Sequence, residues 1–144
     1  TPELVVLDLV ASDKADATRQ IAEKLQAAGR VTDLEGFLKD VAAREAQMAT
    51  GMPGGIGLPH ARSEHVTVPS LGLARVPAGV DFGAPDGPAT LVFLIAAPAG
   101  GGSEHLTILA ALARRLVRPA FRQTIIDAAD EAAVASYVQS EVGG

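Results

Sequence analysis

The residues of this chain with the clearest potential for chemistry are a histidine and the stiff segment that leads to it. Residues 54–62 read Gly-Gly-Ile-Gly-Leu-Pro-His-Ala-Arg. Glycine lets the backbone come close to a ligand, and Pro59 fixes φ and has no backbone N–H to donate. His60 is therefore expected to be held in place by the chain and to be accessible to a ligand or partner. The alternative is a surface histidine without a role, but this glycine- and proline-rich approach favours a functional one.

Two further residues could join His60 around a phosphoryl group. His105 is expected in the first turn of a helix, two residues after a Ser103 cap, where free N–H groups and the helix dipole favour an anion. Arg44 is expected at a helix end just before the glycine-rich segment. Taken singly, His105 could be a solvated first-turn residue and Arg44 a cation that satisfies the helix dipole. Together with His60 they could stabilise the oxygens of a phosphoryl group as it moves.

Other kinds of site are disfavoured. The glycines of residues 51–57 lack the Lys-Ser/Thr of a P-loop and the form of a dinucleotide-binding turn, and the chain has no Gly-x-Ser-x-Gly elbow. A metal site of His60 and His65 with Glu104 or His105 is conceivable, but the chain has neither a His-Glu-x-x-His motif nor a paired-carboxylate motif, so neither metal nor cofactor is expected. His65 is interpreted as a solvated loop residue.

Composition narrows the class of protein. The chain has 144 residues, which is the size of one domain, and its net charge of −5 with 3% aromatic residues disfavours nucleic-acid binding. It contains no cysteine, which is compatible with the cytosol. The longest apolar run, residues 91–97, is too short to span a bilayer, so membrane insertion is not expected. A start at Thr1 is expected of a piece excised from a longer protein.

The pattern of apolar residues predicts an α/β fold with a mixed central sheet and helices on both faces. Strands are expected at 4–10, 70–76 and 90–97, the last of them buried on both sides, with some antiparallel pairing around 70–76. Helices are expected from Asp13 to about Gly29, from a capping box at 32–35 to about 46, from 103, from 119 and from 130. Residues 50–59 cannot form a helix, 77–79 and 83–88 should be turns, and 98–102 should be a loop.

Two blocks of sequence resemble a known family. Arg44-Glu45, Thr50-Gly51 and the residues Gly-Ile-Gly-Leu-Pro-His-Ala-Arg of 55–62 are similar to the signature around the phosphorylated histidine in the enzyme IIA domain of the fructose/mannitol class (EIIA type 2). This domain belongs to the bacterial phosphoenolpyruvate-dependent sugar phosphotransferase system. Residues 91–98 with Glu104-His105-Leu106 resemble its second block, and the match spans residues 1–144 as a single domain.

The resemblance implies a relay of phosphoryl groups. His60 would accept the group from the histidine-containing phosphocarrier protein and pass it to an enzyme IIB domain, usually to a cysteine there, for the uptake and phosphorylation of a sugar, with fructose expected. His105 would be the second active-site histidine, and Arg44 would steady the phosphate. The membrane domain selects the sugar in this family. Met52-Pro53 and Gly57 are not the commonest residues of the signature, and they leave the substrate subtype open.

The same resemblance implies a cytoplasmic location, with possible fusion to IIB and membrane IIC domains. A nitrogen-related regulatory enzyme IIA, which controls partner proteins through its phosphorylation state, is the alternative. A non-catalytic binding module is disfavoured because His60, His105 and Arg44 are all present. A relay histidine also needs its second ring nitrogen tied down, and a docking rim that Ile56, Leu58, Ala61 and residues 100–102 are predicted to supply.

Overall fold

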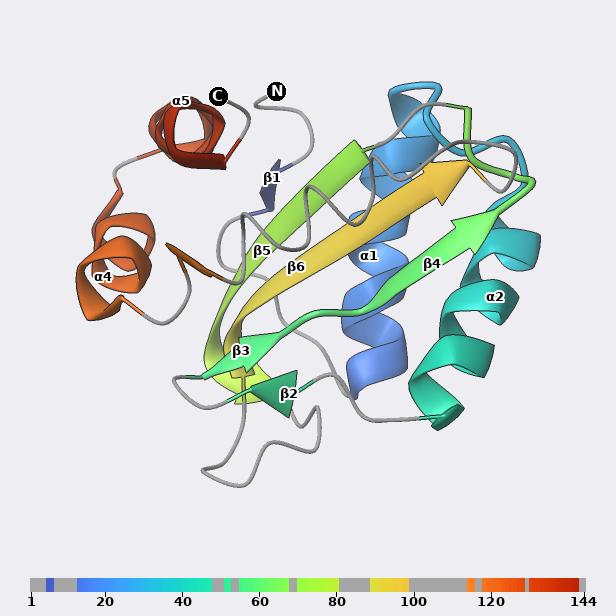
Figure 1. Cartoon of the computed structure of the whole chain (residues 1–144), viewed down its shortest axis with the longest axis horizontal. Coiled ribbons are helices and arrows are strands. Elements are labelled where there is room, and N and C mark those ends of the chain that lie inside the picture. Colours follow the sequence, from blue (N-terminus) through green and yellow to red (C-terminus); the bar gives the residue numbers. More distant parts are fainter. Residues whose placement is uncertain are drawn as a thin grey trace.

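The computed structural model describes residues 5–6, 13–47, 51–52, 55–67, 70–80, 89–98, 114–115, 118–128 and 130–142. They form a mixed six-stranded sheet with helices on both faces (Figure 1), which confirms the predicted α/β class. The elements are β1 (Val5–Val6), α1 (Lys14–Ala27), α2 (Leu34–Gln47), β2 (Gly51–Met52), β3 (Ile56–Gly57), β4 (His60–Ser63), β5 (Ser70–Val80), β6 (Ala89–Pro98), α4 (Pro119–Asp127) and α5 (Glu131–Val142).

The sheet is organised around β6. The strand order is β1-β5-β6-β3-β2, and β4 also pairs with β6. β5 pairs with β6 antiparallel, as expected, whereas β3 and β4 follow one another along the other side of β6 in parallel. Residues 91–96 are all buried, with alternate side chains in the core beneath α1 and α2 and in the core beneath α4 and α5. The prediction of a central strand covered on both faces is therefore confirmed.

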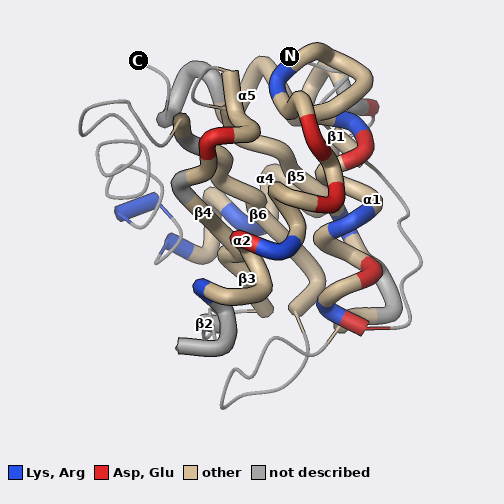
Figure 2. Tube along the Cα trace, turned by 90° about the vertical axis from the view of Figure 1, so that its right-hand side faces the viewer, with Lys and Arg blue, Asp and Glu red and all other residues tan. Residues whose placement is uncertain are grey.

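Helix α1 begins and ends as its sequence indicates. The Asp13 side chain accepts a hydrogen bond from the Asp16 amide at 2.8 Å, and Gly29 follows the helix with a φ of 77°. Buried residues at 17, 21 and 25 face the sheet. Acidic and basic residues are interspersed along the exposed side of α1 (Figure 2), so this helix presents no surface of a single sign.

Helix α2 begins one residue later than the predicted capping box requires. Asp33, not Thr32, caps the helix by accepting a hydrogen bond from the Gly36 amide at 3.2 Å. The Thr32 hydroxyl instead donates to the carbonyl of His65, and the Glu35 carboxylate pairs with Arg19 on α1 at 2.8 Å. The capping box fails because both of its side chains have partners outside α2.

Strand β5 continues beyond the predicted turn at 77–79. Its pairing with β6 shifts between Arg75 and Val80, and Gly79 has a φ of 81°. The turn residues thus form an irregularity inside the strand rather than its end. Arg75 reaches across the sheet face and donates to the carbonyls of Ile125, Ile126 and Ala128 at 3.2, 2.9 and 2.7 Å. These bonds tie the end of α4 to β5.

The predicted helix starts at the C-terminal end are confirmed. Pro119 is the first residue of α4, and the Asp130 side chain accepts from the Ala133 amide at the start of α5. Of the helix expected from 103, only residues 114–115 are described, and both are helical. The predicted turn at 83–88 lies outside the described residues, as does the predicted loop at 98–102 apart from Pro98, which is the last residue of β6 rather than part of a loop. Within the described part of the chain, no helix is long and apolar enough to cross a membrane.

Candidate functional site

The segment that carries His60 is one parallel strand with an interruption. Ile56 pairs with Leu91, and His60 pairs with Ile95, so β3 and β4 keep the same offset along β6. The Leu91 amide donates to the Gly55 carbonyl at 3.0 Å, and the Ile95 amide donates to the Pro59 carbonyl at 3.0 Å. The chain therefore keeps its register between β3 and β4.

Pro59 explains the interruption. Because its carbonyl faces β6, its nitrogen faces β6 as well, at the position where a parallel ladder would donate to the Phe93 carbonyl. Proline has no N–H, so this single bond is missing and the ladder resumes at His60. Residues 50–59 contain no helix in their described part, as expected, but the short strands β2 and β3 were not predicted.

The same alternation aims the Leu58 carbonyl away from β6. Carbonyls of Gly55 and Pro59 face β6, so the carbonyl of Leu58 between them points to the outer edge of the strand. There it accepts a hydrogen bond from Nδ1 of the partly buried His60 at 2.8 Å. The imidazole ring thus curls back along the edge of the sheet.

This contact determines which ring nitrogen is available for chemistry. A backbone carbonyl only accepts hydrogen bonds, so Nδ1 of a neutral His60 must carry the proton. Nε2 then keeps its lone pair and is the nucleophilic atom. The prediction that one ring nitrogen is tied down is confirmed.

Arg44 lies on the element that packs beside His60. It is in the last turn of α2 and partly buried, and α2 packs against β4. Both Arg44 and His60 are described, and no hydrogen bond or ion pair joins them. His105 lies outside the described residues. Of the three predicted site residues, the structure therefore locates only Arg44 and His60, on the neighbouring elements α2 and β4.

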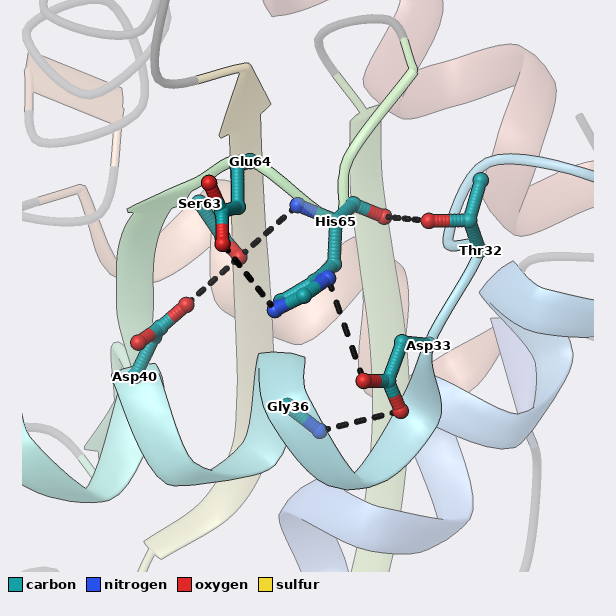
Figure 3. Close-up of polar contacts among 7 residues, drawn as sticks. All are labelled: Thr32, Asp33, Gly36, Asp40, Ser63, Glu64 and His65. Atoms are coloured by element: carbon teal, nitrogen blue, oxygen red, sulfur yellow. Dashed lines mark hydrogen bonds and ion pairs between the residues drawn. The ribbon is translucent and has the colours of Figure 1, made fainter.

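Two interpretations of neighbouring residues are wrong. Ile56, Leu58 and Ala61 are only 0, 6 and 8% exposed, because they belong to the two cores, and they cannot form a docking rim. The side chain of His65 is 27% exposed and lies between Asp33 and Glu64 (Figure 3), so it is not a freely solvated loop residue. Residues 100–102, the rest of the predicted rim, lie outside the described part.

The structure also reveals polar groups that sequence patterns did not single out. One is the backbone carbonyl of Leu58, which no motif of side chains can indicate. Another is the pair formed by Ser63 and Asp40, which joins the end of β4 to the middle of α2. Among the described residues, no group of three His, Asp or Glu side chains could hold a metal ion.

Comparison with known proteins gives the chain its relatives. The profile of the family described as "Phosphoenolpyruvate-dependent sugar phosphotransferase system, EIIA 2" matches residues 1–141. A Haloferax volcanii protein named "PTS system fructose-specific EIIA component" is 39% identical over 127 residues, which are 88% of this chain and 82% of that protein. The Bacillus subtilis "PTS system fructose-specific EIIABC component" is 32% identical over 139 residues, but this 96% of the chain covers only 22% of that longer protein.

The fold is shared with solved structures. The nitrogen regulatory protein IIA-Ntr from Neisseria meningitidis superposes with a TM-score of 0.87 at 24% sequence identity. The match covers 96% of this chain and 94% of that one. At this identity the likeness concerns the arrangement of helices and strands.

The hydrogen bond to Leu58 predicts the tautomer of His60. In a long-range ¹H–¹⁵N correlation spectrum of the neutral ring, Nδ1 should have the shift of a protonated nitrogen and Nε2 that of a nitrogen with a free lone pair. The signals are assigned by their loss in His60→Gln. The reverse pattern, with the proton on Nε2, would contradict the geometry.

Proposed function

The chain belongs to the EIIA 2 family of the phosphoenolpyruvate-dependent sugar phosphotransferase system and is thus a phosphotransferase component, and we propose that His60 is its phosphoryl-accepting residue. The observation that carries the proposal is the 2.8 Å hydrogen bond from Nδ1 of His60 to the carbonyl of Leu58. It leaves Nε2 as a bare nucleophile at the edge of the sheet.

The transfer needs little chemistry from the protein beyond position and charge. The Nε2 lone pair forms a bond to phosphorus while the N–P bond of the donor's phosphohistidine breaks, and that bonding pair returns to the donor's ring. The proton on Nδ1 stays in place throughout. Because the His60 ring gains positive charge when Nε2 is bonded to phosphorus, the Leu58 carbonyl stabilises the phosphorylated state through the same hydrogen bond.

Arg44 is proposed to hold the phosphoryl oxygens. A guanidinium presents donors in a planar fork that fits phosphate, and it keeps its charge at all relevant pH values. Arg44 is in the last turn of α2, and α2 packs against the strand that His60 begins. The His60 side chain leaves the opposite face of β4, so Arg44 would reach a phosphoryl group on Nε2 around the open edge of this strand.

His105 is proposed as the second histidine of the site, which assists without being modified. The support is the sequence Glu104-His105-Leu106, which follows the apolar block 91–98 as in the family's second motif. A histidine there could donate a hydrogen bond to the phosphate or orient the incoming group.

The partners and the sugar are proposed from the family and from the relatives that the chain matches. The donor is proposed to be the histidine-containing phosphocarrier protein and the acceptor an enzyme IIB domain, in the cytoplasm, with fusion or association to a membrane IIC domain. Fructose is the proposed sugar, because two relatives at 39 and 32% identity are named as fructose-specific. The likeness to a nitrogen regulatory IIA protein, at 24% identity, supports the shared fold and not a regulatory role.

Phosphorylation of His60 can be measured directly. After incubation with phosphoenolpyruvate, enzyme I and the phosphocarrier, the intact mass should rise by one acid-labile, base-stable phosphoryl group, which a fructose-class IIB domain should then remove faster than a mannitol-class one. His60→Gln should abolish the gain, and the matched variant His65→Gln should retain it. A phosphorylated His60→Gln variant would overturn the assignment.

The role of Arg44 predicts that lysine replaces it poorly. Arg44→Lys should slow transfer from the phosphorylated phosphocarrier by about 10- to 100-fold in rapid-quench experiments, because a point charge loses the forked contact. Arg19→Lys is the matched control, since the exposed Arg19 pairs with Glu35 at the α1–α2 contact. Transfer by Arg44→Lys at the wild-type rate would reduce Arg44 to a helix-end cation.

The role of His105 predicts coupling to the phosphorylation state of His60. The ring signals of His105 should shift in NMR spectra when His60 is phosphorylated, and His105→Ala should slow transfer without preventing phosphorylation of His60. A His105 titration unaffected by phosphorylation, together with an unchanged rate in His105→Ala, would remove His105 from the site.

A further inference from the structure

A partly buried polar link joins α2 to β4 on the side of the sheet opposite the α4–α5 core. Ser63, the last residue of β4, is 1% exposed and donates its hydroxyl proton to Oδ2 of Asp40 at 2.6 Å (Figure 3). The same hydroxyl oxygen accepts a hydrogen bond from the His65 amide at 3.1 Å. A short hydrogen bond to a carboxylate is among the stronger links available to a side chain. The middle of α2 is therefore fixed to the end of β4.

The start of α2 is held to the residues just after β4. The Thr32 amide and hydroxyl both donate to the carbonyl of His65, at 2.8 and 3.2 Å, and Asp33 caps the helix at Gly36. The His65 ring lies on Gly36 so closely that a Cβ there would be 2.5 Å from Nε2. A side chain larger than that of glycine at position 36 would therefore collide with the His65 ring.

These contacts show that α2 and β4 run in opposite directions. Gly36, Asp40 and Arg44 are four residues apart and share one side of α2, and each step of four advances the helix by about 6 Å. Along β4 and the two residues that follow it, the matching order runs backwards. His65, after the strand, contacts Gly36, and Ser63, at its end, contacts Asp40.

This order leads from Asp40 and Ser63 to the proposed site. One helical turn beyond Asp40 is Arg44, and three residues before Ser63 is His60, about 10 Å away along an extended strand. The His60 side chain leaves the other face of β4, so Arg44 can reach it only around the open edge of this strand. A slide of α2 along β4 would shift Arg44 relative to His60.

The apolar contacts of α2 do not determine this axial position by themselves. Phe37 and Val41 are buried against the sheet and hold the helix to it, but hydrophobic contact has no direction. A hydrogen bond of fixed length does, and a misplacement of about 1 Å in a reacting group can cost 100-fold in rate. We propose that Asp40 and Ser63 are positioning residues, whose hydrogen bond sets the place of Arg44 relative to His60. This inference rests on the proposed function of those two residues.

The test is a double-mutant cycle on the transfer rate. Ser63→Ala should lower the rate constant at saturating phosphorylated phosphocarrier by about tenfold and leave the half-saturating donor concentration unchanged, since positioning acts on the transfer step. In the background of Arg44→Met, the same substitution should change the rate less than about twofold, because the group it positions is gone. Thr18→Val, which removes another buried hydroxyl within α1, is the matched control and should keep the wild-type rate.

If Ser63→Ala does not fold, a second pair of variants tests the same proposal. Asp40→Asn keeps an oxygen that accepts from Ser63 and should retain more of the rate than Asp40→Leu, with folding of each checked by its amide NMR spectrum. Equal rate losses from Ser63→Ala in both Arg44 backgrounds, or wild-type rates in Ser63→Ala and Asp40→Leu, would overturn the positioning role. A wild-type chain that takes up no phosphoryl group on His60 would instead overturn the proposed function.

Discussion

Parallel pairing with β6 holds the chain from Ile56 to Ser63 in one register, and Pro59 removes a single donor from that ladder without shifting it. Strand alternation then decides which carbonyls face β6 and which face the edge. Because the carbonyl of Leu58 faces the edge and not β6, it can accept a hydrogen bond from His60. The orientation of the imidazole, and hence which of its two nitrogens keeps a lone pair, follows from backbone geometry rather than from a neighbouring acidic side chain.

This arrangement suits the relay proposed for His60, which would be phosphorylated and then give the phosphoryl group away. A carboxylate partner on Nδ1 would favour the positively charged, phosphorylated ring strongly and would make it a poorer donor. A neutral carbonyl fixes the same tautomer with less bias toward either state. The proposed contribution of Arg44 then acts on the phosphoryl oxygens rather than on the ring, so position and charge are supplied by different elements.

Sequence patterns predicted what depends on local chemistry and on burial. The predictions of an apolar strand at 90–97 and of helix starts at Asp13, Pro119 and Asp130 were all correct, because each depends on residues close together in sequence. Errors arose where a side chain bonds to a residue that is distant in sequence. Thr32 resembles a cap, but the carbonyl of His65 takes its hydroxyl, and the Ser63–Asp40 bond spans 23 positions with no sequence signal. Likewise, the hydrophobicity of Leu58 suggested a docking rim, whereas its carbonyl is the group that contributes to the site.

The proposed site would draw on both faces of the sheet, and this requires an open edge. By alternation with Ile95, the side chain of His60 starts on the face of α4 and α5, whereas α2 carries Arg44 on the other face. Within a sheet the two could not meet, but β4 has β6 as its only neighbour among the described strands. An open edge also invites pairing with another chain. β4 is only 4 residues long, which limits that risk, and the helix that is proposed to deliver Arg44 packs against this same strand.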